Sequence, residues 1–185
     1  MHETGCGAPE RKFCGAGGGL AVTDGTVIEG YASLFGKTDS GGDVVEAGAY
    51  ARSLARIAQA GRRVKMLWQH DPGEPIGVWD EVREDATGLY VRGRVLTEVA
   101  RGREAAALIG AGAIDGLSIG YRTVKARAEG RGRRLTDLDL WEVSLVTFPM
   151  LAEARVGAKG EAAGDALLRD MAAAVEDARK VLAGA

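Results

Sequence analysis

The sequence has few of the features that stabilise small secreted proteins or hold proteins in membranes. Its two cysteines, Cys6 and Cys14, both lie in the Gly-rich first part of the chain, which excludes a disulfide framework for the remainder. No apolar run approaches the roughly 20 residues that a transmembrane helix requires. The first residues also lack the apolar segment of a secretory signal. These absences favour a soluble cytoplasmic protein.

Histidine is equally scarce, with only His2 and His70 in 185 residues. His2, Cys6 and Cys14 supply three potential metal ligands, but two thiols and one imidazole are an incomplete set for a structural zinc site. We therefore expect neither a metal nor a cofactor. The net charge of −2 gives no whole-molecule reason to expect a nucleic-acid partner.

The composition predicts an aliphatic core in one domain with tails. Aromatic residues make up only 5 % of the chain, while hydrophobic residues make up 46 %. We predict a flexible Gly-rich leader over 1–25, a folded domain over 26–156, and a linker with an amphipathic helix over 157–185. That helix is expected at about 164–183, where apolar residues recur at helical spacing.

Periodicity and turn residues predict strands and helices throughout the central part of the chain. Strands are expected at 27–35, 64–70, 76–85, 88–96, 116–127 and 133–148, and helices at about 47–60 and 98–111. Pro72 and Pro75 cannot donate to a β-ladder, so 71–75 is predicted to be a turn. The apolar positions between 133 and 148 do not keep one period, which predicts a bend or bulge near 139–142.

The predicted strands outnumber the helices and run mostly as hairpins. We therefore predict an α+β fold with an antiparallel, barrel-like β-sheet, and not a doubly wound parallel sheet. The helix at 47–60 has an apolar stripe through Tyr50 and Ile57, which we expect to be buried, with Arg52 and Arg56 facing away.

Ser118 lies between two glycines in the stretch GLSIG at 116–120, which fits the G-x-S-x-G pattern of a nucleophile elbow. An elbow needs a strand before the serine and a helix after it, whereas here a helix precedes and a strand follows. The histidine also precedes the serine, the reverse of the order in α/β-hydrolases, so that fold is excluded. Ser118 is either a nucleophile or a buried strand serine bonded to the backbone.

His70 is the only histidine outside the leader, and histidine is the usual base for activating a serine at neutral pH. The alternative is a strand-end histidine that contacts Asp71 or solvent. Glu142 stands between apolar residues on a predicted strand, where a carboxylate has to be paired. It could orient the imidazole as the third member of a catalytic triad, a place for which Asp137 and Asp139 compete.

Ser144 is a second candidate nucleophile. It is expected on the same side of its strand as Glu142, but it lacks glycine neighbours.

The loop between Arg122 and Arg134 is basic, which indicates either a solvated hairpin tip or a surface for an acidic protein partner. Nucleic acid is disfavoured there because no aromatic residues interleave the charges.

Four stretches of the sequence carry a family resemblance when they are taken together. They are GYASLFGKTDSGGDVVEAGAY at 30–50, MLWQHDPGEPIGVW at 66–79, GLSIGYR at 116–122 and LWEVSLVTFPMLAEARV at 140–156. In this order and spacing they resemble the prohead (capsid maturation) proteases of tailed bacteriophages. The resemblance covers about 26–156 and is far more specific than any one of its motifs.

This resemblance implies the fold of the herpesvirus assemblins, a closed β-barrel-like sheet with helices around it. It also implies that Ser118 is the nucleophile, His70 the general base and Glu142 the third member. The donors of the oxyanion hole are left open between backbone N–H groups near the glycines and the side chain of Arg122.

The implied function is that of a serine endopeptidase of capsid maturation. Such an enzyme works inside the assembling prohead in the host bacterial cytoplasm, where it cleaves the N-terminal scaffolding part of the major capsid protein and then itself. The expected partners are this capsid protein, the portal and prohead assembly, and another copy of the chain. The alternative is a non-enzymatic capsid scaffold or assembly protein that keeps the protease fold. A phage, a prophage and a gene transfer agent all remain open as the source.

Overall fold

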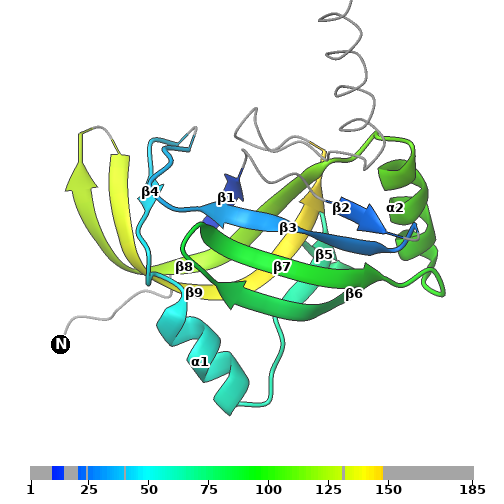
Figure 1. The fold of residues 1–185 in the computed structure, drawn as a ribbon, viewed down its shortest axis with the longest axis horizontal. Coiled ribbons are helices and arrows are strands. Elements are labelled where there is room, and N and C mark those ends of the chain that lie inside the picture. Colours follow the sequence, from blue (N-terminus) through cyan, green and yellow to red (C-terminus); the bar gives the residue numbers. More distant parts are fainter. Residues whose placement is uncertain (1–9, 15–20, 24, 40, 131, 148–185) are drawn as a thin grey trace, which may run out of the picture.

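The described part of the chain forms one curled, mixed β-sheet with two helices (Figure 1). The computed structural model describes residues 10–14, 21–23, 25–39, 41–130 and 132–147. The strands are β1 (Glu10–Cys14), β2 (Ala21–Thr23), β3 (Val27–Leu34), β4 (Val44–Val45), β5 (Lys65–Trp68), β6 (Asp71–Glu84), β7 (Gly88–Val95), β8 (Gly116–Glu129) and β9 (Gly132–Val146). The helices are α1 (Ala51–Gln59) and α2 (Ala100–Gly110). Paired strands follow the order β1-β8-β9-β5-β6-β7-β3-β2, and β4 pairs with β9.

Two strand pairings are parallel, so the predicted antiparallel sheet is wrong in this respect. β4 and β5 both run parallel to β9, whereas the other paired strands are antiparallel. Hydrophobic periodicity marks a strand but does not say which distant strand it joins, so the parallel pairing could not be predicted from it. The described residues contain two helices beside the sheet, and the likeness to the assemblins stays a prediction.

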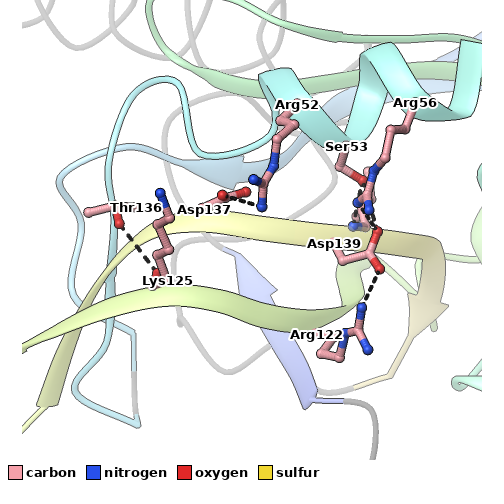
Figure 2. A network of polar contacts seen from close by, with 9 residues as sticks. Arg52, Ser53, Arg56, Arg122, Lys125, Thr136, Asp137 and Asp139 are labelled. Atoms are coloured by element: carbon pink, nitrogen blue, oxygen red, sulfur yellow. Dashed lines mark hydrogen bonds and ion pairs between the residues drawn. The ribbon is translucent and has the colours of Figure 1, made fainter. Parts of the chain in front are cut away.

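The two helices lie mainly against different strands. α1 contacts chiefly β9 and also β6, whereas α2 contacts β6 and β7. Figure 2 shows Arg52 and Arg56 of α1 reaching Asp137 and Asp139 of β9, at 2.5 and 2.6 Å. The two arginines are half-exposed, but they do not simply face solvent as predicted, because they join α1 to the sheet. Neither described helix is long and apolar enough to cross a membrane.

β6 begins at Asp71, so the predicted turn at 71–75 is wrong. The chain instead turns just before it, at Gln69 and His70. A proline favours an extended conformation in the residue before it, which suits Asp71 as the first strand residue. β7 pairs with β6 only from Gly77 onward, so both prolines lie where β6 has a partner on one side, a position in which a sheet tolerates proline.

A bulge in β9 confirms the irregularity predicted near 139–142. The ladder between β8 and β9 skips Trp141, because Leu140 and Glu142 oppose successive residues of β8. A one-residue bulge reverses the alternation of the strand. The core-facing residues of β9 are accordingly Leu138 and Leu140 before the bulge and Val143 and Leu145 after it. Glu142 and Ser144 are therefore directed to the opposite face of the sheet.

Two strands lie in the part of the chain that the sequence predicts to be a leader without regular structure. β1 pairs with β8 and β2 pairs with β3, both antiparallel. Main-chain hydrogen bonding to a sheet edge can order a segment whose composition suits no core, which a compositional argument does not include. The helix predicted at 164–183 lies outside the described residues, and the domain boundaries at 26 and 156 stay predictions.

The core between these elements is mainly aliphatic, as predicted. Its two largest fully buried side chains are Tyr50 and Tyr121, followed by aliphatic residues and one methionine, such as Ile28, Met66 and Ile76. Glycines allow the strands to approach closely where the sheet curls. At Gly93, a Cβ would collide with the carbonyl oxygen of Val78 and with the ring of Trp79.

We predict that Gly93→Ala destabilises the protein, whereas Gly110→Ala does not. The added methyl group at Gly93 has to move the backbone of β6, and overpacking of this kind costs about 1–3 kcal/mol. At Gly110, the last residue of α2, a Cβ meets nothing within 4 Å, and alanine is the better helix former. Thermal denaturation of both variants measures the difference. Equal melting temperatures would contradict this account of the curl.

Candidate active site

Ser118 lies on β8, on the face opposite to the hydrophobic core. Its two chain neighbours belong to the core, so strand alternation directs Ser118 and Gly120 to the other face. Across the ladder, Ser118 opposes Ser144 and Gly120 opposes Glu142. The pairing of β8 with β9 therefore gathers a serine, a carboxylate and a position without a side chain beside Ser118.

His70 lies on a tight turn between β5 and β6. Trp68 pairs with Asp71, which leaves Gln69 and His70 as a two-residue loop. Both loop residues have positive φ, 52° and 64°, which is the combination required by a type I′ hairpin turn. Such turns usually contain Asn-Gly, because the left-handed region costs other residues about 1–2 kcal/mol each.

Contacts with the end of β9 hold this turn in place. The N–H of Gln69 donates to the carbonyl oxygen of Leu145 at 2.9 Å, and its side-chain amide donates to Thr147 Oγ1 at 2.6 Å. The N–H of His70 donates to Ser144 Oγ at 3.2 Å. These hydrogen bonds keep Gln69 and His70 in their unfavourable backbone conformation, and they thereby fix the position of the imidazole.

The imidazole of His70 connects Ser118 with Glu142. Its Nε2 lies 2.6 Å from Ser118 Oγ, and its Nδ1 lies 2.5 Å from Glu142 Oε1. All three residues are buried, with relative exposures of 0, 6 and 8 % for Ser118, His70 and Glu142. A carboxylate at Nδ1 favours the tautomer with its proton on that nitrogen, which leaves Nε2 to accept the serine proton.

Two neighbours position the carboxylate of Glu142. Ser144 Oγ donates to Glu142 Oε2 at 2.5 Å and also accepts the main-chain N–H of His70. A Cβ on Gly120 would collide with the same carboxylate, so the glycine provides the space in which it lies. These contacts fit a positioning role for Ser144 better than the role of second nucleophile that the sequence suggested.

The rival carboxylates Asp137 and Asp139 lie in a separate network on β9 (Figure 2). Asp139 accepts from Arg56 at 2.6 Å and from Arg122 at 3.3 Å, and Asp137 pairs with α1 as described above. The structure therefore brings Glu142 to the histidine and ties the two aspartates to arginines. Arg122, one of the open choices for an oxyanion donor, is engaged in this network as well.

No metal site accompanies Ser118 in the part of the chain that the structure describes. No group of three or more His, Cys, Asp and Glu side chains there could hold a metal ion. A cavity of about 570 Å³ opens beside the end of α1, lined by Arg62, Arg63, Lys65 and Trp141 among others. None of its lining residues belongs to the group formed by Ser118, His70 and Glu142.

The three candidates chosen from the sequence thus lie together, although they come from β8, the β5–β6 turn and β9. The strained turn under His70 was not predicted, because Gln-His is an unusual sequence for such a turn. The positioning contacts of Ser144 were not predicted either. The signal for Ser144 was its spacing of two residues from Glu142, which puts both side chains on one face of a strand.

The family model described as caudovirus prohead serine protease matches residues 20–166. The chain belongs to this family. A curated relative, the prohead protease of Enterobacteria phage HK97, is 34 % identical over 149 residues, which is 78 % of this chain. The chain spans 65 % of the length of the HK97 protein.

A solved structure has the same fold as this chain. The bacteriophage T4 capsid assembly protease superimposes with a TM-score of 0.62 over 76 % of this chain and 98 % of that chain. Sequence identity between the two is 17 %, so this likeness shows the fold alone. The curled mixed sheet is therefore a capsid protease fold.

We predict that Gly120→Ala separates Glu142 from His70 while the fold persists. The new methyl group occupies the space of the carboxylate, so the hydrogen bond between Glu142 Oε1 and His70 Nδ1 is broken or lengthened. Proton NMR measures this as loss of the strongly downfield signal of the imidazole N–H. Gly110→Ala on α2 is the matched control and keeps the signal. An unchanged signal in Gly120→Ala would show that the carboxylate has room elsewhere.

Proposed function

We propose that this chain is a serine endopeptidase of capsid maturation, with Ser118 as nucleophile, His70 as general base and Glu142 as third member. The observation that carries the proposal is the continuous line of contacts from Ser118 Oγ through the imidazole to Glu142, at 2.6 and 2.5 Å. Membership of the prohead serine protease family supports the same chemistry.

In the proposed reaction, His70 Nε2 takes the proton from Ser118 Oγ as this oxygen attacks a peptide carbonyl carbon. The tetrahedral intermediate then expels the amine, which receives the proton from His70, and an ester of Ser118 remains. Water attacks the ester with His70 again as base, releasing the acid and restoring the serine. Glu142 stabilises the imidazolium that forms in each step.

We propose the N-terminal scaffolding part of the major capsid protein as the substrate, and the chain itself as a second substrate. The relatives are named as a prohead protease and as a capsid assembly protease, which supports a place inside the assembling prohead. The host bacterial cytoplasm, contact with the portal and the shell, and self-association belong to this proposal too. The reaction as written needs no metal and no cofactor.

Co-expression with the major capsid protein tests the proposed activity. We expect the wild-type chain to shorten the capsid protein, and Ser118→Ala to leave it at full length, because no other group replaces the nucleophile. Intact masses of both proteins measure the outcome and locate the cut. Cleavage by Ser118→Ala would contradict the assignment of the nucleophile.

We predict that Glu142→Gln retains more activity than His70→Ala. Removing the base costs up to about 10⁶-fold in kcat in a serine protease, and replacing the third member by an amide costs on the order of 10⁴-fold. Single-turnover cleavage of the capsid protein measures the three rates. Wild-type activity in Glu142→Gln would refute its role beside the imidazole.

The alternative function, a non-enzymatic capsid scaffold with a protease fold, makes the opposite prediction for the co-expression experiment. A scaffold protein would leave the capsid protein at full length with either chain. Identical masses from wild type and Ser118→Ala, together with correctly assembled shells, would favour this alternative.

A further inference from the structure

A segment from a distant part of the chain covers the edge of β8 that carries Ser118. β1 runs antiparallel to β8, with Phe13 opposite Ser118 and Cys14 opposite Leu117. The pairing extends over 117–121, so it covers the main chain on both sides of the serine. β9 pairs with the other edge of β8 and supplies Glu142 and Ser144 to the site.

β1 also lies near a strand from the other end of the strand order. It contacts β3 as well as β8, although these two strands stand far apart in the strand order. Figure 1 shows β1 as a short arrow near β3. β1 therefore lies next to both β3 and β8, and β8 is the strand that carries Ser118.

An extended peptide can reach a nucleophile on a strand by adding to the free edge of that strand, where main-chain hydrogen bonds align it. On β8 the only edge that β9 leaves for this purpose is the one that β1 takes. Acylation requires the peptide carbonyl within about 3–3.5 Å of the serine oxygen, yet Ser118 is 0 % exposed. Because β1 already pairs with the one edge of β8 that β9 leaves, β1 and a substrate strand cannot both pair with 117–121.

We propose that β1 occupies the place of the substrate strand, and that the capsid protein binds antiparallel to β8 by displacing β1. This inference rests on the proposed protease function and adds the surface to which the substrate binds. The sequence of β1, ERKFC, contains no β-branched residue, and Phe13 is its one aromatic residue of the kind that favours strands. A segment with a weak intrinsic preference for the strand conformation is more easily displaced by a peptide that pairs more strongly with β8.

A reversible disulfide tests this proposal in the full-length chain. Cys14 is directly opposite Leu117, and such residues in an antiparallel pair lie about 4.5–5.5 Å apart at Cα, within the span of a disulfide. Leu117→Cys therefore allows β1 to be locked to β8 by oxidised glutathione and released by dithiothreitol. Cys6→Ser is included in every variant to exclude other pairings. The matched control carries Leu117→Cys with Cys14→Ser and forms no lock.

We expect the oxidised Leu117→Cys chain to lose cleavage of the capsid protein in proportion to its crosslinked fraction, and dithiothreitol to restore it. The Cys14→Ser control should cleave equally in both conditions. Full cleavage by the locked chain would overturn the proposal. Failure of the wild-type chain to cleave under any condition would instead contradict the proposed protease function, so the two failures are distinguishable.

Hydrogen exchange provides a second readout that needs neither catalysis nor a new cysteine. In the Ser118→Ala chain, we expect an excess of the N-terminal region of the capsid protein to expose the amides of 10–14 to exchange. The amides of 117–121 should remain protected, because the substrate strand replaces β1. Retained protection of 10–14 with the capsid protein bound would overturn the proposal.

Discussion

The buried contact between Glu142 and the imidazole of His70 is the interaction on which the site depends. A carboxylate with 8 % exposure has lost most of its water, so it requires hydrogen-bond partners in the protein that replace this water. The surrounding features all serve this contact. The bulge at Trp141 directs Glu142 away from the core, Gly120 leaves space for its carboxylate, and Ser144 holds the second oxygen.

β9 is the strand that holds the residues around this contact in place. It pairs with β4, β5 and β8, and its end holds the strained turn of His70 through Leu145 and Thr147. On its other part, Asp137 and Asp139 fix it to α1. A strand anchored at so many points can keep an imidazole in place, although the two turn residues adopt an unfavourable backbone conformation.

The sequence predicted the elements well because alternation along β7 or helical spacing along α1 is a local property. The bulge in β9 was predictable for the same reason, since a broken period is visible in the strand itself. The parallel pairing of β5 with β9 and the ordering of β1 were not, because both depend on partners far away in the sequence. For the site, residue chemistry proposed Ser118, His70 and Glu142 beside several alternatives, and the family resemblance selected these three. Their mutual geometry, and the role of Ser144, required the fold.

The spread of the site along the chain has a consequence for its synthesis. His70 and Ser118 are 48 residues apart in sequence, and His70 and Glu142 are 72 apart. Contacts of such separation close large loops and form late in folding. A ribosome therefore produces His70 and Ser118 before the strand that supplies Glu142. The growing chain carries a serine and a histidine without a working arrangement, and acquires one only after β9 has emerged and paired.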